Sequence, residues 1–263
     1  MPCSGPGNQP NQGTRPPRPR ALGRAVAALL GTALLAGCGA TPSSAGGTSS
    51  ATQASPAGCA KGAAGTPAFT LAVAQEPATG VATPTGKCWS SIAYTGITNI
   101  STGQPPSGVS GQFKAAWSAQ NLYVLAWVQK WPLQADNGGP AYTNDTIEFY
   151  LGGDNTKQTS YGPNDCQVSV VYTGRAASHD TCNTSRTFTP VAQVVPNKGY
   201  YIDLIVPWNM LNVAKPAKGQ QYSFSIAWDI PDGNGNRVAQ MEWAGGQNDD
   251  WQSTQNWGTI TLA

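Results

Sequence analysis

Apolar and polar residues alternate with a period of two along most of the chain from Pro67 onward, in short runs separated by Gly, Pro, Asn and Asp. In the run 221–229, large apolar residues occupy the even positions, and smaller or polar residues occupy the odd ones. This period places successive side chains on opposite faces of a β-strand. The same pattern predicts strands near 112–117, 122–128, 145–151, 166–172, 187–195, 202–206, 238–243 and 257–262.

Turn-forming residues lie between these strands, and no window shows a sustained helical period. The polar stretches 118–121 and 232–236 each predict a hairpin, and 208–211 predicts a single helical turn. Many short strands joined by turns indicate two antiparallel sheets packed face to face. We therefore predict an all-β fold, a jelly-roll-like two-sheet antiparallel β-sandwich, over residues 67–263, which is long enough for one domain with a sizeable core.

The first 37 residues have a different composition. An apolar run at 25–37 follows four arginines, with no acidic residue before Cys38. The run is shorter than the roughly 20 apolar residues that span a bilayer, and a basic lead before a short apolar core is typical of a signal peptide. Its end, Leu35-Ala36-Gly37-Cys38, resembles the bacterial lipobox, which implies that Cys38 is lipidated. The alternative is an ordinary cleaved signal followed by a chance cysteine.

Residues 38–66 consist almost entirely of Gly, Ala, Ser, Thr, Pro and Gln. Such a stretch cannot bury a core, so we expect a disordered, flexible tether behind the lipidated cysteine. This arrangement predicts an extracytoplasmic protein that is held to the bacterial cell membrane through its lipid anchor only.

The charge of the chain changes when the predicted signal peptide is removed. Residues 1–37 contain four of the 15 basic residues and no acid, so 11 basic and 13 acidic residues remain, a net charge of −2. This balance leaves no basic surface that would favour nucleic acid. We expect neutral partners and a monomer.

Four cysteines remain in the predicted mature domain and tether, namely Cys59, Cys88, Cys166 and Cys182. An even number of cysteines in an exported chain favours disulfide bonds. Of the three ways to pair them, we favour Cys59–Cys88 and Cys166–Cys182, because each joins near neighbours in the sequence. The alternative, a zinc site, lacks a close cysteine pair, and His179 is the only histidine.

Several sequence blocks follow one another in an order that points to a known family. They are Trp89, Trp117 with Leu122–Val124, Asn144–Tyr150, Gly199–Ile202 with Val206–Trp208, Gly219 with Tyr222–Phe224 and Asp229, Asp232–Arg237 with Glu242–Trp243, and Trp257–Leu262. In this order, and over about residues 87–263, they resemble the family 9 carbohydrate-binding modules and their sugar-binding DOMON-like relatives. The resemblance implies a non-catalytic domain that binds carbohydrate of the cello- or xylo-oligosaccharide type.

The resemblance also implies a binding site for a terminal sugar between two aromatic side chains. Tyr142 and Trp251 match the two aromatic positions, Glu148 matches a strand glutamate, and Asn248 matches an asparagine three residues before the loop tryptophan. An aromatic ring covers the apolar face of a pyranose, and polar groups must satisfy its hydroxyls. Trp131, just before a proline, is a reserve candidate.

Three positions depart from the family pattern. Ser169 and Val171 stand where the family has arginine and asparagine, and Ala227 stands where it has glutamine. These changes remove much of the polar rim of the site. They therefore leave open an alternative function, a non-catalytic β-sandwich envelope protein that has lost sugar binding and acts in protein interaction.

Three further interpretations have weaker support. The resemblance implies structural calcium as an open alternative, held through other groups, because the calcium-like spacing at 232–236 lacks a closing glutamate. We favour a hairpin turn at 232–236 and assign no cofactor. A glycoside hydrolase needs two suitably spaced carboxylates, and no catalytic motif surrounds the three glutamates, so we expect no enzyme activity. A haem-binding redox domain would need Met210 or Met241 together with His179, which lie in unsuitable segments.

Overall fold

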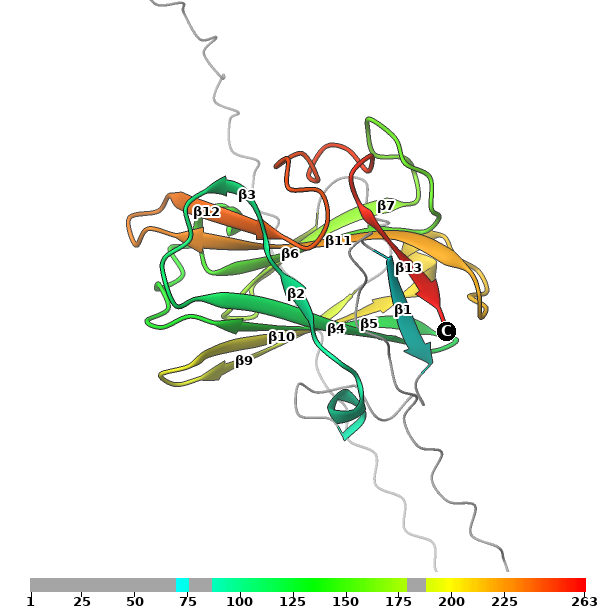
Figure 1. Cartoon of the computed structure of the whole chain (residues 1–263), viewed down its shortest axis with the longest axis horizontal. Helices are drawn as coiled ribbons and strands as arrows, with labels where there is room; N and C mark the ends of the chain where they lie inside the picture. The colour runs from blue at the N-terminus through cyan, green and yellow to red at the C-terminus, as the bar shows by residue number, and fades with distance from the viewer. Residues whose placement is uncertain (1–69, 76–86, 179–187) are drawn as a thin grey trace, which may run out of the picture. The chain divides into compact units, whose positions relative to one another are not determined.

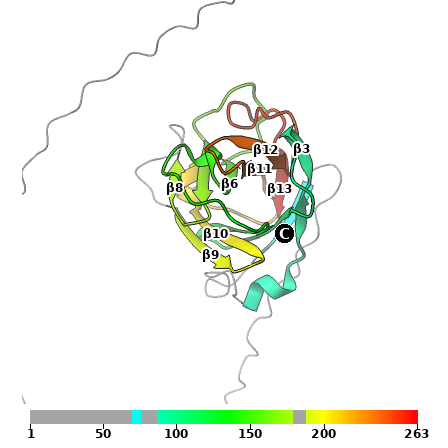
Figure 2. The same cartoon turned by 90° about the vertical axis from the view of Figure 1, so that its left-hand side faces the viewer.

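Two β-sheets packed face to face form the described part of the chain (Figure 1). The computed structural model describes residues 70–75, 87–178 and 188–263. Sheet A contains β3 (Asn99–Gly103), β6 (Thr146–Gly152), β7 (Asp165–Val171), β8 (Ala176–Ser178), β11 (Gln221–Pro231), β12 (Arg237–Glu242) and β13 (Gly258–Leu262). Sheet B contains β2 (Thr95–Ile97), β4 (Ser110–Trp117), β5 (Asn121–Gln129), β9 (Thr189–Val195) and β10 (Gly199–Pro207). Figure 2 shows β6, β11 and β12 on one side and β9 and β10 on the other.

Strand β1 (Thr70–Gln75) joins the two sheets. Its first four residues pair with β13 of sheet A, and its last two pair with β4 of sheet B. Both pairings are parallel, whereas the other strand pairs of the described residues are antiparallel. The prediction of a two-sheet antiparallel sandwich is confirmed, with β1 as an addition that closes one side.

The main core lies between the sheets and contains the apolar residues predicted from the alternation. Phe113 on β4 meets Phe224 on β11 and Trp243 after β12, with ring centroids 5.6 and 5.4 Å away. Each of these rings is almost fully buried. The inward row at even positions of β11 is therefore confirmed as core.

The opposite face of sheet A is also buried, which the alternation alone does not predict. Ser223, Ser225 and Asp229, on the polar face of β11, are each no more than 1% exposed. Two loops above this face, at 153–164 and 243–257, cover it (Figure 1). They contact each other, because the Tyr161 hydroxyl donates to the Asp250 carbonyl at 2.6 Å. Polar side chains beneath these loops must therefore find partners inside the protein.

The short elements between the strands follow the sequence signals. Hairpin turns at 118–121 and 232–236 are confirmed by backbone hydrogen bonds of 2.8 and 2.9 Å. The predicted helical turn is η3 (Trp208–Leu211), and two further turns are η1 (Lys87–Ser91) and η2 (Ala141–Thr143). No helix among the described residues is long and apolar enough to cross a membrane.

The predicted signal peptide and the whole predicted tether, which contains Cys38 and Cys59, lie outside the described residues. Cys166 is buried on β7 and forms a disulfide bond. Cys182 also lies outside the described residues, as does the side chain of Cys88. The pairing of the four cysteines and the lipidation of Cys38 stay predictions.

Candidate functional site

A pocket of about 650 Å³ opens on the outer face of sheet A, and we name it the Trp251 pocket. The four residues predicted to bind sugar all line it, although they come from three separate segments of the chain. These residues are Tyr142, Glu148, Asn248 and Trp251, and the other lining residues are Pro140, Ala141, Gln167, Ser169, Ala177 and Arg237.

The floor of the pocket is a row of side chains that crosses three strands. Glu148 on β6 pairs with Ser169 on β7, and Ser169 pairs with Ala177 on β8. Residues that pair across strands project from the same face of a sheet, so these three line the floor together. Two of the three side chains are small, and this leaves room above Glu148.

Glu148 is buried in this floor and accepts four hydrogen bonds from the protein. Its Oε1 accepts from Gln167 at 3.2 Å and Ser169 at 3.0 Å, and its Oε2 accepts from Tyr150 at 2.7 Å and Gln240 at 3.1 Å. An ionised carboxylate has about four lone-pair sites. A sugar hydroxyl can therefore donate to Glu148 only by replacing one of these donors, so the carboxylate also organises the floor.

Arg237, at the start of β12, supplies the positive charge of the lining. Its Nη1 lies 3.0 Å from Oδ1 of the fully buried Asp229, and its Nη2 donates to Oδ1 of Asn248 at 3.1 Å. Burial and the nearby Glu148 raise the pKa of Asp229, whereas Arg237 lowers it. The guanidinium also lies 5.6 Å from the ring centroid of Tyr142. These contacts connect the two sides of the pocket.

Tyr142 stands on η2 at one side of the pocket and is 48% exposed. The short helix is fixed beside β6, because the Thr146 hydroxyl donates to the Ala141 carbonyl at 2.6 Å. A tyrosine that is held firmly at its backbone and exposed at its ring offers a flat apolar surface with a polar end.

Trp251 stands in the loop after β12 and is 55% exposed. Its indole Nε1 donates to the Asn248 carbonyl at 3.0 Å. Asn248 has a φ of 54°, a left-handed conformation that asparagine tolerates better than most residues. Its neighbour Asp250 is 1% exposed, so the loop is anchored by a buried side chain next to an exposed tryptophan.

The structure adds polar residues of the site that the sequence did not single out. Arg237 lines the pocket and Gln240 lies beneath it, where its amide bridges Glu148 and Asp229 at 3.1 and 3.0 Å. Both are on β12. The alternation along β12 was the sequence signal for these residues. Placing Gln240 opposite Asp229 also requires the register of the β11–β12 hairpin, which the alternation does not give.

The three departures from the family pattern have different outcomes. Ser169 remains part of the pocket and donates to Glu148 at 3.0 Å. Val171 and Ala227 are fully buried and do not line the pocket. Ala227 instead packs with Tyr150 and Trp257 in a small apolar cluster under the loops. Val171 and Ala227 therefore give the pocket no polar group, and the polar groups near its floor come from Arg237 and Gln240 of β12.

Two buried carboxyl groups lie near the base of the Trp251 loop. Burial raises the pKa of Glu242 to about 7. Burial, together with the charge of Glu242, raises the pKa of Asp250 to about 8. In the described part of the chain, no three His, Cys, Asp or Glu side chains are grouped so that they could hold a metal ion. The carboxyl of Asp232, in the calcium-like stretch, accepts hydrogen bonds from Asn234 and Asn236 of its own turn.

Comparison with known proteins supports this fold. Residues 82–263 match the family model described as "Carbohydrate family 9 binding domain-like". The chain therefore belongs to this family of non-catalytic carbohydrate-binding domains.

The chain is similar to a small part of several larger enzymes. The chain is 23% identical over 174 residues to endo-1,4-beta-xylanase A of Thermotoga neapolitana, covering 66% of the chain and 16% of that enzyme. It is 27% identical over 158 residues to endo-1,4-beta-xylanase A of Thermoanaerobacterium saccharolyticum, covering 59% of the chain and 13% of the enzyme. The matched region is thus less than a fifth of these relatives.

A solved structure shows the same fold. It is a family 9 carbohydrate-binding module from Caldicellulosiruptor kristjanssonii in complex with cellotriose, which is 22% identical with a TM-score of 0.62. The match covers 73% of this chain and 93% of that one. The same module in complex with glucose gives a TM-score of 0.63 at 22% identity, over 74% of this chain and 94% of that chain.

Proposed function

We propose that the Trp251 pocket binds the terminal sugar of a cello- or xylo-oligosaccharide, with the pyranose held between Tyr142 and Trp251. The observation that carries this proposal is that two exposed aromatic residues and two polar residues, expected from the family pattern, line one pocket. Related modules in complex with cellotriose and glucose support a neutral sugar of this type.

The polar groups of the pocket suit the hydroxyls of such a sugar. Arg237 has five N–H donors, of which Asp229 and Asn248 each accept one. The remaining N–H groups of Arg237 and the side-chain amide of Asn248 are the donors that we expect a bound sugar to use. Glu148 contributes an acceptor if Gln167, its longest contact at 3.2 Å, gives way. The site therefore offers apolar faces, donors and an acceptor within one pocket.

We further propose that the domain is anchored outside the cytoplasm through lipidated Cys38 and supports carbohydrate catabolism. The lipobox-like end of the apolar run supports the anchor. The relatives named as xylanases support a role beside polysaccharide-degrading enzymes, with no catalysis by this domain itself. Replacing Cys38 by serine should release the protein from the membrane fraction and abolish incorporation of labelled fatty acid.

A second candidate function is a β-sandwich that has lost sugar binding and acts in protein interaction. Val171 and Ala227, which are apolar where the family has polar residues, favour it. The two candidates differ in a simple assay, the depletion of the protein from solution by insoluble cellulose or xylan.

The proposed function predicts depletion by at least one of these polysaccharides. Trp251→Ala should abolish it, because half of the aromatic clamp is lost. Trp131→Ala is the matched control on cellulose, an uncharged glucan, since this tryptophan is similarly exposed, at 47% against 55%, but lies outside the Trp251 pocket. A wild-type protein that stays in solution with both polysaccharides would favour the second candidate.

A further inference from the structure

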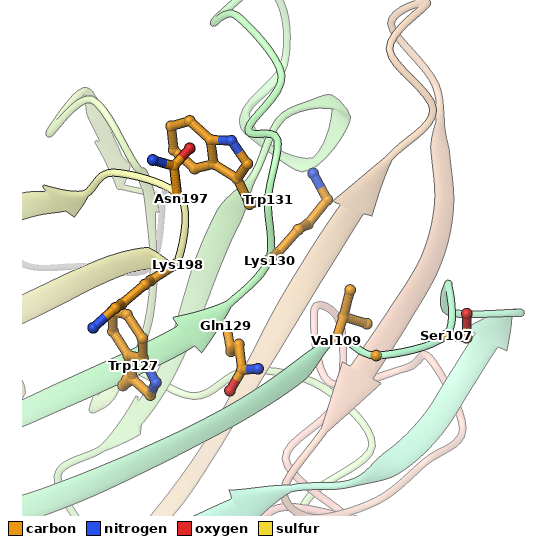
Figure 3. Close-up of a pocket in the computed structure, with 9 residues that line it drawn as sticks. Ser107, Val109, Trp127, Gln129, Lys130, Trp131, Asn197 and Lys198 are labelled. Atoms are coloured by element: carbon orange, nitrogen blue, oxygen red, sulfur yellow. The ribbon is translucent and has the colours of Figure 1, made fainter.

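A second pocket, of about 430 Å³, lies where the β9–β10 hairpin meets the end of β5 (Figure 3). We name it the Trp131 pocket. The strand β5, the residues that follow it and the turn between β9 and β10 each contribute to its wall. The side chains that matter for its chemistry are Trp127, Gln129, Lys130, Trp131, Asn197 and Lys198.

The backbone holds the two sides of the Trp131 pocket together. The Lys130 N–H donates to the Lys198 carbonyl at 3.1 Å, which ties the end of β5 to the β9–β10 turn. Asn197 has a φ of 61° in this turn. Gly199 follows at a φ of 154°, and a Cβ there would lie 1.8 Å from the carbonyl oxygen of Val128. The close approach of β10 to β5, which places Asn197 and Lys198 at the pocket, therefore requires glycine.

The pocket combines aromatic surfaces with amide groups. Trp127 is partly buried and packs on Tyr201 of β10 with ring centroids 4.3 Å apart, and Trp131 is 47% exposed. Asn197 and Lys198 line this pocket together with both tryptophans (Figure 3). The side-chain amides of Gln129 and Asn197 form no hydrogen bond with the described residues. These are groups that can cover a pyranose face and bind its hydroxyls.

The charge of the Trp131 pocket differs from that of the Trp251 pocket. Lys130 is neutralised, because its ammonium lies 2.9 Å from the carboxylate of the fully buried Asp145. Lys198 is exposed and has no ion-pair partner among the described residues. Among the described residues, no carboxylate lines this pocket, whereas Glu148 lines the other. The Trp131 pocket therefore carries one uncompensated positive charge.

We propose that the Trp131 pocket binds a pyranose that carries a carboxylate, a uronate unit of a polysaccharide. The indole rings of Trp127 and Trp131 cover the sugar, the amides of Gln129 and Asn197 bind its hydroxyls, and Lys198 pairs with its carboxylate. This site is separate from the Trp251 pocket and does not depend on the function proposed there.

Glucuronate and glucose provide a matched pair of ligands, because they differ only in the group at C6. The purified chain is titrated with the methyl glycoside of each, and the indole N–H signals of the tryptophans are followed by NMR. Methyl glucuronide should shift the signals of Trp127 and Trp131, and methyl glucoside, which lacks the carboxylate, should shift them with about fivefold weaker affinity. Lys198→Met should weaken glucuronide binding about fivefold, a loss of about 1 kcal/mol for one solvent-exposed charge contact.

Lys218→Met is the matched control, because Lys218 is an equally exposed lysine outside the pocket. It should leave glucuronide binding unchanged, as should Trp251→Ala. The proposal is overturned if methyl glucuronide moves neither indole signal, if methyl glucoside binds this pocket equally well, or if Lys198→Met has no greater effect than Lys218→Met. If methyl glucoside leaves the indole signal of Trp251 unmoved, this result counts against the Trp251 pocket and not against the Trp131 pocket.

Discussion

The ion pair between Arg237 and Asp229 links the fold of sheet A to the binding pocket, so its removal should destabilise the protein strongly. The perturbation is Arg237→Met, which keeps most of the side-chain volume and removes the charge. Asp229 is 0% exposed, and the Arg237 side chain is 21% exposed. The variant leaves a buried carboxyl group without the cation that lowers its pKa.

The size of the effect follows from this burial. Breaking a buried ion pair by removing one partner costs about 3–5 kcal/mol. Because Arg237 is partly exposed, water can reach the vacated space, and we expect a loss near the lower end, about 3 kcal/mol. The double variant Asp229→Asn with Arg237→Met should recover most of this loss, since the asparagine oxygen can still accept the bond from Gln240.

The loss of unfolding free energy in Arg237→Met should also depend on pH. Burial raises the pKa of Asp229, and removal of Arg237 should raise it further. A carboxyl group whose folded-state pKa is raised gives stability below its unfolded pKa, and this stability is lost as the pH rises through the folded-state pKa. The difference between Arg237→Met and wild type should therefore be larger at pH 8 than at pH 5.

Urea unfolding followed by tryptophan fluorescence measures these free energies. Wild type, both single variants and the double variant form a double-mutant cycle. This role of Arg237 is excluded if Arg237→Met costs less than about 1 kcal/mol at pH 7, or if the double variant is as unstable as Arg237→Met alone. In either case Asp229 would not depend on Arg237 for its charge compensation.

Two further predictions concern the buried acids and the cysteines. Because burial raises the pKa of Glu242 to about 7 and that of Asp250 to about 8, both groups favour the folded state at low pH, and this contribution is lost as the pH rises through 7 to 8. The melting temperature should therefore fall between pH 6 and pH 8, and it should fall less in Asp250→Asn. A rise of the melting temperature over this range would contradict the raised pKa values. A higher melting temperature with calcium than with chelator would show that these carboxyls bind an ion instead of a proton. A thiol titration of the unreduced, denatured protein should find none of Cys59, Cys88, Cys166 and Cys182 free, whereas four free thiols would exclude the predicted disulfide bonds.

The regular strands of the sandwich were predictable because their burial follows the period of two. The run at 221–229 became β11, and the runs at 122–128 and 202–206 became β5 and β10, each with its apolar row in the core. β1, β2, β3 and β8 were missed. Three of them have only three to five residues, too few for the alternation to stand out, and β1 depends on two parallel partners that are distant in the sequence.

The candidate site was predictable only where the family pattern named residues. Tyr142, Glu148, Asn248 and Trp251 were named in this way, and they line one pocket. The network of Asp229, Arg237 and Gln240 was not foreseen, because it depends on the register of β11 with β12 and on the burial of a face that looked solvent-exposed. The loops at 153–164 and 243–257 bury the polar face of sheet A, so its side chains form hydrogen bonds and ion pairs with one another.

The proposed sugar binding rests on the aromatic clamp in the Trp251 pocket. Calorimetric titration of the purified chain with glucose, cellobiose, xylobiose and chitobiose measures this binding. We expect binding of glucose, cellobiose or xylobiose that is abolished by Trp251→Ala, weakened by Tyr142→Ala and unchanged by Trp131→Ala. Absence of binding to all four sugars by the folded protein, or binding that survives Trp251→Ala, would contradict it.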